Sequence, residues 1–397
     1  MMKAVLILWC AASLSAALEP TSLKSASNGL TEVHEETAVE QPRKLLECAD
    51  PHPIRKVMVT GANGYLASHI VKQLLDKGYE VNACVRDAFN ESSVRNLVRL
   101  DSSAGKLNLF TTGDFGNLSL RGRYTEPLKG CDAVIHTAIP LPPKSSTTNF
   151  DPERDMLHPG MEGTRELLES ILECDTSIQS LVLTSSMAAA SPMLEPAVKD
   201  ESHWSDDAAQ LASKNYYGCL KTRQERMCHE WARAQKEAGT LADSFRFVAI
   251  CPAKIIGPPV GLDQEGFSCS PSGWMGLLYH WLTGSGLSVP NDSMAFIDVR
   301  DCAAMHVAAM DNRDASGRYF SVAESWHRNE ILTTMKELYP QIPPFTLYEG
   351  EPIKPTKFNL KRMNRLGVTV RGMQTMLRDS ISLFKDAGLL KLNDIDS

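Results

Sequence analysis

The chain lacks several features that would assign it to common functional classes. It has no run of lysines and arginines, and its 41 basic and 48 acidic residues leave a net charge of −7, which argues against a nucleic-acid or anionic-membrane partner. Its cysteines form no CxxC pair and its histidines no HExxH spacing, so no metal site is indicated. There is also no internal repeat. These absences leave a small molecule as the expected partner.

Long hydrophobic runs are also missing, because no apolar stretch reaches the ~20 residues needed to span a bilayer. A shorter run at 4–14 follows Met1-Met2-Lys3 and precedes small residues, a pattern typical of a secretory signal peptide at 1–17. Residues 18–53 are polar and aperiodic, so we expect a disordered linker there. The prediction is entry into the secretory pathway, in the ER lumen or beyond. The alternative is an organelle reached through the signal plus a transit segment.

A strand, a glycine turn and a helix follow one another after the linker. A β-branched run at 56–60 leads into the turn, and residues 67–77 have helical periodicity. Gly61 permits a tight turn, and Gly64 lets the backbone approach a pyrophosphate at the helix N-terminus. Residues 78–85 then supply a helix stop and a second parallel strand. This order predicts a dinucleotide-binding α/β fold.

The end of the second strand distinguishes the two nicotinamide cofactors. An NAD site usually presents a carboxylate to the ribose 2′-hydroxyl, whereas Arg86 suits a 2′-phosphate. NADP is therefore favoured over NAD, although Asp87 becomes the end residue if the strand is one residue longer. Further strands are expected at 106–110 and 133–138. Asp114, just past the first of them, is either an adenine contact or a simple turn residue.

Tyr217 and Lys221 are four residues apart in the sequence. On a helix, residues i and i+4 share a face, so we expect the Lys221 ammonium beside the Tyr217 phenol. A phenol titrates near ~10, and an adjacent cation favours phenolate, which brings its pKa closer to the pH at which proton transfer is efficient. The spacing predicts a tyrosine that acts as a catalytic acid.

Several motifs occur in one collinear order between residues 54 and 390. They are Thr60-Gly61-Ala-Asn-Gly64-Tyr-Leu-Ala67, Asp151-Pro-Glu, Glu162-Gly163-Thr164, Leu183-Thr184-Ser185-Ser186, Glu201-Ser-His-Trp204-Ser-Asp206, Tyr217-Gly-Cys-Leu-Lys221, Phe296-Ile-Asp298-Val-Arg300-Asp301 and Gly317-Arg-Tyr319. In these motifs the chain resembles the extended short-chain dehydrogenase/reductases of the NAD-dependent epimerase/dehydratase superfamily. Within them it resembles the group of dihydroflavonol reductases, cinnamoyl-CoA reductases and yeast-type methylglyoxal/aldehyde reductases.

The resemblance implies a set of site residues. Ser186, Tyr217 and Lys221 would form the catalytic triad, with Ser186 rather than Ser185 in the serine position. The implied cofactor contacts are Gly61, Asn63, Gly64, Tyr65, Leu66, Arg86, Asp114, Thr137, Ala138, Tyr217, Lys221 and Pro252. One departure is Leu220, where relatives usually carry a small or hydroxyl residue, and it leaves the substrate open.

The resemblance also implies a Rossmann doubly wound parallel sheet at 54–255 and a smaller C-terminal substrate-binding lobe at 256–391, with 296–325 packing back on the sheet. The implied enzyme is an NADPH-dependent oxidoreductase, monomeric or homodimeric, that reduces a ketone or aldehyde with a proton from Tyr217, or runs the reverse reaction. Alternatives are a 3β-hydroxysteroid-type dehydrogenase, a sugar-nucleotide epimerase/dehydratase and a non-catalytic NAD(P)-sensing protein. The apolar helix expected at 274–282 lines a substrate pocket or belongs to the core.

Overall fold

The computed structural model describes residues 53–100, 105–114, 121–140, 149–174, 178–194, 196–260, 273–284 and 287–390. All of them belong to one compact unit, residues 46–397. The predicted signal peptide and all but the last residue of the predicted linker lie outside the described residues, so both stay predictions. Among the helices in these ranges, none combines the length and the apolar character that a membrane span requires.

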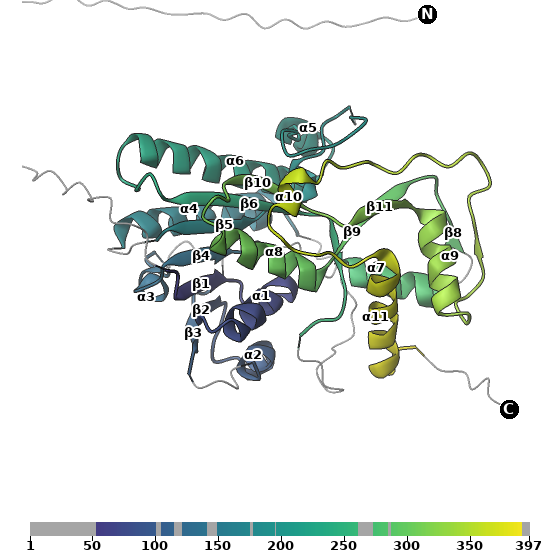
Figure 1. Ribbon diagram of the computed structural model, residues 1–397, viewed down its shortest axis with the longest axis horizontal. Coiled ribbons are helices and arrows are strands. Elements are labelled where there is room, and N and C mark those ends of the chain that lie inside the picture. The colour runs from purple at the N-terminus through teal and green to yellow at the C-terminus, as the bar shows by residue number, and fades with distance from the viewer. Residues whose placement is uncertain are drawn as a thin grey trace, which may run out of the picture. The chain divides into compact units, whose positions relative to one another are not determined.

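Seven parallel strands form the main sheet (Figure 1). They are β1 (Lys56–Thr60), β2 (Glu80–Val85), β3 (Leu107–Thr111), β4 (Ala133–His136), β5 (Ser180–Thr184), β6 (Arg246–Pro252) and β10 (Gly317–Ser321). Their order is β10-β6-β5-β4-β1-β2-β3, with every pair parallel. The strand order reverses between β1 and β4, which is where such sheets bind ligands. The predicted doubly wound fold is confirmed.

Helices cover both faces of this sheet (Figure 1). The helices of this part are α1 (Tyr65–Asp76), α2 (Glu91–Val98), α3 (Thr125–Leu128), α4 (His158–Glu173), α5 (Asp207–Ala212), α6 (Tyr216–Glu237) and α8 (Val299–Asp311). Successive strand residues point to opposite faces, so Val57 and Val59 pack in a cluster with α1 and α8, while Met58 packs with α3, α4 and α6. Residues buried on both faces explain why these strands are continuous apolar runs rather than alternating ones.

A second group of elements follows β6. A three-stranded sheet has the order β11-β9-β7, with β7 (Lys254–Ile256), β9 (Ser293–Asp298) and β11 (Glu324–His327), and a two-stranded sheet pairs β8 (Leu287–Ser288) with β12 (Phe345–Thr346). Helices α7 (Gly273–Thr283), α9 (Arg328–Leu338) and α11 (Met373–Asp386) share one buried apolar cluster with them, and α10 (Lys361–Asn364) lies against β10. The division into two domains near residue 255 falls within β7 and stays a prediction.

The strand predicted at 133–138 is shorter than expected, because β4 ends at His136. The Thr60 hydroxyl oxygen accepts hydrogen bonds from the backbone N–H groups of Thr137 (3.1 Å) and Ala138 (3.2 Å). These side-chain contacts bend the chain away from the strand direction, and no local sequence pattern reports them. The other predicted strands and helices lie within one or two residues of their observed bounds.

Candidate active site

The turn between β1 and α1 packs directly against the end of β4. Gly61 has φ +62°, and a Cβ added there would lie 3.0 Å from Ala138 Cα. Both the backbone conformation and the close approach therefore require glycine. The sequence-predicted cofactor residues Gly61, Thr137 and Ala138 are thus brought together at the point where the strand order reverses.

The side chains of the residues around the start of α1 contact other parts of the protein. Gly64 is the N-cap and provides no side-chain cap. The Asn63 amide donates to Ser93 O at 3.1 Å, the Tyr65 hydroxyl donates to Gly257 O at 2.6 Å, and Leu66 is buried in the core. Burial also raises the Tyr65 pKa well above its ordinary value. Ala62 N and Gly64 N already donate to Cys84 O (3.0 Å) and Gly61 O (2.9 Å). What this turn offers a ligand is the helix N-terminus that begins at Tyr65, where backbone N–H groups favour an anion.

Arg86 and Asp114 come together at the adjoining end of β2 and β3. Their Nε and Oδ1 atoms are 4.0 Å apart, and the side chains are 76% and 63% exposed. The connection is held by a backbone bond from Gly113 N to Arg86 O (3.1 Å) and by Arg123, whose guanidinium donates to Asp114 O (2.9 Å). The predicted cofactor-selecting arginine therefore lies at the carboxyl edge of the sheet with its charge in solvent.

Ser186 and Tyr217 form a second part of this edge. Ser186 follows β5 and caps the short 3-10 helix Met187–Ala189, accepting from Ala188 N at 3.1 Å. Ser185 is instead buried and donates to Glu225 Oε2 at 2.5 Å. The Tyr217 residue is 39% exposed. The part of its ring that the protein buries raises the Tyr217 pKa, opposed by the hydrogen bond with Ser186.

The expected lowering of the Tyr217 pKa by Lys221 is wrong for the protein chain alone. Lys221 is buried, and its ammonium donates to Thr184 O (2.7 Å) and to Gln224 Oε1 (3.2 Å). Burial lowers the Lys221 pKa to about 8, opposed by the Glu225 carboxylate. The expectation considered the i, i+4 spacing only, whereas the desolvation of both groups depends on the whole fold.

Glu225 on α6 binds two residues near Ser186 and Tyr217, namely Ser185 and Arg318. Its buried carboxylate pairs with Arg318 of β10, at 2.5 Å from Nε, and the Arg318 guanidinium lies 3.9 Å from the Trp204 ring centroid. Burial raises the Glu225 pKa, but the neighbouring His229, the Arg318 charge and the Ser185 hydroxyl outweigh it, so the net pKa is lowered. This buried ion pair connects α6 with β10, and the Ser185 hydrogen bond joins the residue before Ser186 to the same carboxylate.

Pro252 and Leu220 occupy different surroundings. Ser185 N donates to Ile250 O at 2.7 Å, which places Pro252, two residues further along β6, at the same edge of the sheet. Leu220 is fully buried against α4, where a Cβ added at Gly160 would lie 2.7 Å from Leu220 Cδ2. Its bulk is thus accommodated by a glycine on the neighbouring helix.

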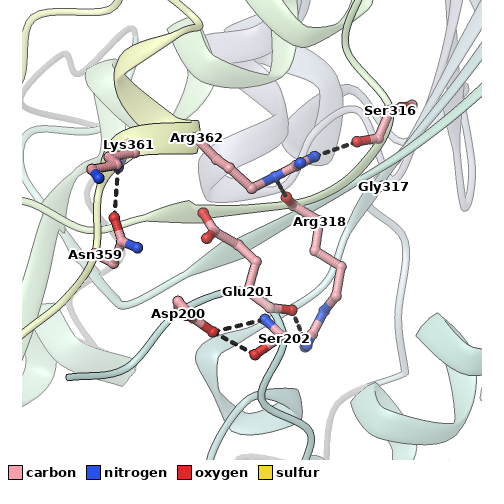
Figure 2. Close-up of a pocket in the computed structure, with 9 residues that line it drawn as sticks. All are labelled: Asp200, Glu201, Ser202, Ser316, Gly317, Arg318, Asn359, Lys361 and Arg362. Carbon is pink, nitrogen blue, oxygen red and sulfur yellow. Dashed lines mark hydrogen bonds between the residues drawn. The ribbon is translucent and has the colours of Figure 1, made fainter. Parts of the chain in front are cut away.

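A pocket elsewhere on the molecule contains none of the predicted site residues. It lies along β10 and α10, and its lining residues are Asp200, Glu201, Ser202, Ser316, Gly317, Arg318, Asn359, Lys361 and Arg362 (Figure 2). The Arg362 guanidinium donates to Arg318 O and Ser316 O, and the Asp200 carboxylate accepts from the Ser202 hydroxyl. These polar groups satisfy one another, so we assign the pocket a structural role.

No group of three or more His, Cys, Asp or Glu side chains in the described ranges is arranged to hold a metal.

The residues that sequence reasoning missed are Gln224, Thr164, His136 and Thr60, which connect Lys221 to the glycine turn through buried hydrogen bonds. Gln224 lies three residues after Lys221 and so shares its helix face, and Thr164 belongs to the Glu162-Gly163-Thr164 motif. The helix-face spacing of Gln224 and the motif that contains Thr164 could therefore have pointed to these two residues from the sequence.

A glycine turn at the strand-order reversal, combined with serine, tyrosine and lysine at the neighbouring strand and helix, defines the architecture of an extended short-chain dehydrogenase/reductase. The chain belongs to the NAD-dependent epimerase/dehydratase family, whose family model matches residues 57–323. The resemblance inferred from the motifs is thereby confirmed.

Several known proteins are similar to this chain over most of its length. Cinnamoyl-CoA reductase 1 of Arabidopsis thaliana is 32% identical, with 85% of this chain and 91% of that protein covered. Tetraketide alpha-pyrone reductase 2 of the same plant is 28% identical, with 84% and 99% covered. Among solved structures, yeast methylglyoxal/isovaleraldehyde reductase in complex with NADPH has a TM-score of 0.69 at 24% identity, with 84% of this chain and 100% of that chain covered. Vestitone reductase from alfalfa has a TM-score of 0.66 at 23% identity, with 84% and 99% covered. The structural likenesses show the shared fold.

Proposed function

We propose that this protein is an NADPH-dependent oxidoreductase that reduces a ketone or aldehyde of a small organic substrate to an alcohol, or catalyses the reverse reaction. The observation that carries the proposal is the contact between Ser186 and Tyr217 at the carboxyl edge of the sheet, with Lys221 on the next turn of α6. The relatives with reductase names support this chemistry, as does the fold shared with a reductase described in complex with NADPH.

The proposed cofactor site lies at the same carboxyl edge of the sheet. The first backbone N–H groups of α1, at Tyr65 and Leu66, would hold the pyrophosphate, and the exposed Arg86 guanidinium would pair with a 2′-phosphate. Bound NADPH supplies a hydride to the carbonyl carbon. The protein's own task is then to hold that carbonyl and to provide one proton.

Tyr217 is the proton donor in this proposal. Its raised pKa keeps the phenol protonated at neutral pH, as an acid must be if it is to protonate the carbonyl oxygen. The Ser186 hydroxyl would donate to the same oxygen and stabilise the negative charge that develops on it. Among the residues that the structure describes, Lys221 uses two of its three N–H groups, and the third would serve the ribose hydroxyl of the cofactor.

The test is NADPH oxidation by the full chain, followed at the nicotinamide absorbance, with aldehydes, diketones, flavanonols and ketosteroids. We expect turnover that falls at least ~100-fold in Tyr217→Phe and stays near wild type in Tyr216→Phe, the matched control on the same turn. Turnover that survives Tyr217→Phe would refute the role of the phenol. Binding of NADPH without turnover of any substrate in the panel would instead favour a sensing protein.

A further inference from the structure

We propose that Lys254 selects the substrate, and that the protein takes a carbonyl compound whose aromatic or apolar body carries an anionic group such as a carboxylate. This inference rests on the proposed reductase function and adds the charge of the substrate to it.

The position of Lys254 relative to the catalytic residues follows from the strand register. β5 pairs with β6 through Thr184 and Ile250. Two residues beyond this pair come Ser186, which follows β5, and Pro252, the last residue of β6. Lys254 is only two residues further and begins β7. Its backbone therefore leaves the sheet at the edge where Ser186 and Tyr217 lie.

The Lys254 ammonium forms no ion pair with any residue that the structure describes. Within the described part of the chain it makes neither a hydrogen bond nor an ion pair, and its nearest specific contact is the Trp274 ring, whose centroid lies 4.7 Å from Nζ. The side chain is half-buried. Burial lowers the pKa of Lys254, because the ammonium loses water without gaining a partner. A ligand carboxylate would supply that partner.

The acid whose charge acts on Lys254 is Asp292, which pairs with Arg328 through Oδ2 while its Oδ1 is buried without a hydrogen-bond partner among the described residues. The Asp292 carboxylate forms an ion pair with Arg328 Nη2, and Arg328 N donates to Asp292 O at 3.1 Å. The Arg328 charge also acts to lower the Lys254 pKa, whereas Asp292 acts to raise it. Lys254, Arg328 and Asp292 together carry one net positive charge, so an anion is the ligand group that would balance this corner of the molecule.

The surroundings of this charge suit an aromatic ligand. Trp274 lies under the ammonium and is itself 41% exposed. Trp281 lies on the same helix as Trp274, α7, and its ring centroid is 5.5 Å from the Arg328 guanidinium. A flat apolar body can stack on Trp274 while its carboxylate meets Lys254. The cation–π contact with Trp274 attracts the ammonium but offers its N–H groups no acceptor oxygen, which a carboxylate would supply.

The first experiment compares two aldehydes of the same shape and different charge. We expect the full chain with NADPH to have a kcat/KM for 4-carboxybenzaldehyde about tenfold above that for 4-methylbenzaldehyde. Lys254→Met should abolish the preference and Lys254→Glu should invert it. Lys129→Met, which removes a lysine that precedes β4 at the opposite edge of the sheet, should retain it. A preference that survives Lys254→Met would overturn the assignment.

A second measurement is independent of turnover. We expect benzoate to bind the NADP-loaded full chain about tenfold tighter than neutral benzamide, and this ratio should approach one in Lys254→Met. If both ligands bind the wild type equally, the inference is wrong even when neutral aldehydes are reduced, and the reductase proposal stands. If neither aldehyde is turned over but the binding ratio depends on Lys254, the charged subsite stands and only the choice of carbonyl compound fails.

Discussion

The Lys221 ammonium donates a hydrogen bond to the side-chain carbonyl of Gln224, with 3.2 Å between Nζ and Oε1. This contact sets the orientation of the Gln224 amide, because its oxygen must face the ammonium and its nitrogen must face away. The nitrogen donates to Thr164 Oγ1 at 2.8 Å. The Thr164 hydroxyl in turn donates to Gly160 O at 2.9 Å. Gln224 is thus fixed between the lysine on its own helix and the neighbouring helix α4.

The chain of hydrogen bonds continues to the glycine turn and determines a histidine tautomer. Thr60 Oγ1 accepts from the N–H groups of Thr137 and Ala138, so its own proton points to His136 Nδ1, 2.7 Å away. His136 Nε2 therefore carries the proton and donates to Thr164 Oγ1 at 3.2 Å. Burial lowers the His136 pKa to about 3, with the Lys221 charge acting in the same direction, so this histidine stays neutral.

Replacing Gln224 should disturb catalysis through Lys221. We expect Gln224→Met to lower kcat/KM about tenfold or more, because a hydrogen bond to a charged group is worth roughly 1.5–3 kcal/mol. Gln224→Glu should instead raise the Lys221 pKa and shift the alkaline limb of the pH–rate profile upward. Gln235→Met on the same helix is the control. A wild-type pH profile in both Gln224 variants would show that this residue has no positioning role.

Lys221 should reduce the stability of the protein at neutral pH. Its pKa is about 8 in the folded chain against 10.5 ordinarily, so the unfolded chain binds the proton more tightly. Stability from this group is therefore lowest below pH 8 and rises between pH 8 and 10.5. The groups that face it are the Glu225 carboxylate, the neutral imidazoles of His136 and His306, and the Cys228 and Cys251 thiols, whose pKa values burial raises.

We expect Lys221→Met to be more stable than wild type at pH 7 and to show a smaller advantage at pH 9.5. Urea unfolding midpoints at the two pH values measure this difference. A constant difference at both values would contradict the assignment of the lowered pKa to Lys221. The same variant should lose most of its turnover.

Gly61 and Gly130 allow a matched comparison of backbone strain and steric contact. Both have positive φ, +62° and +68°, but a Cβ at Gly130 would meet nothing within 4 Å. We expect Gly130→Ala to cost about 1–2 kcal/mol of unfolding free energy. Gly61→Ala should cost more, because its methyl group also contacts Ala138, and it alone should weaken NADPH binding. Equal losses in both variants would mean that the contact with Ala138 relaxes freely.

Arg86 should determine the choice between NADPH and NADH. Removing the guanidinium in Arg86→Ala is expected to lower kcat/KM for NADPH about tenfold or more, since a charge-assisted contact to the 2′-phosphate is lost. The value for NADH should change little. Arg95→Ala, an exposed arginine on α2, serves as the control. An equal loss with both cofactors would assign Arg86 to the fold instead.

The sequence by itself determined the features that depend on near neighbours along the chain. The apolar run of β1, the Gly61 turn and the helix of α1 follow from residue types within a short window, and their motifs sufficed to recognise the family. The i, i+4 spacing correctly placed Tyr217 and Lys221 on one helix. In each case the physical cause is local backbone preference or periodic burial, which can be read without knowing the fold.

Only the tertiary structure decided the properties that depend on distant residues. β4 stops at His136, where the Thr60 hydroxyl takes the N–H groups of the next two residues, and partial burial raises the Tyr217 pKa. The Ser185 hydroxyl donates a hydrogen bond to the carboxylate of Glu225, which is forty residues later in the sequence. Burial and hydrogen bonding between remote segments set these outcomes, since desolvation depends on everything that folding brings around a group.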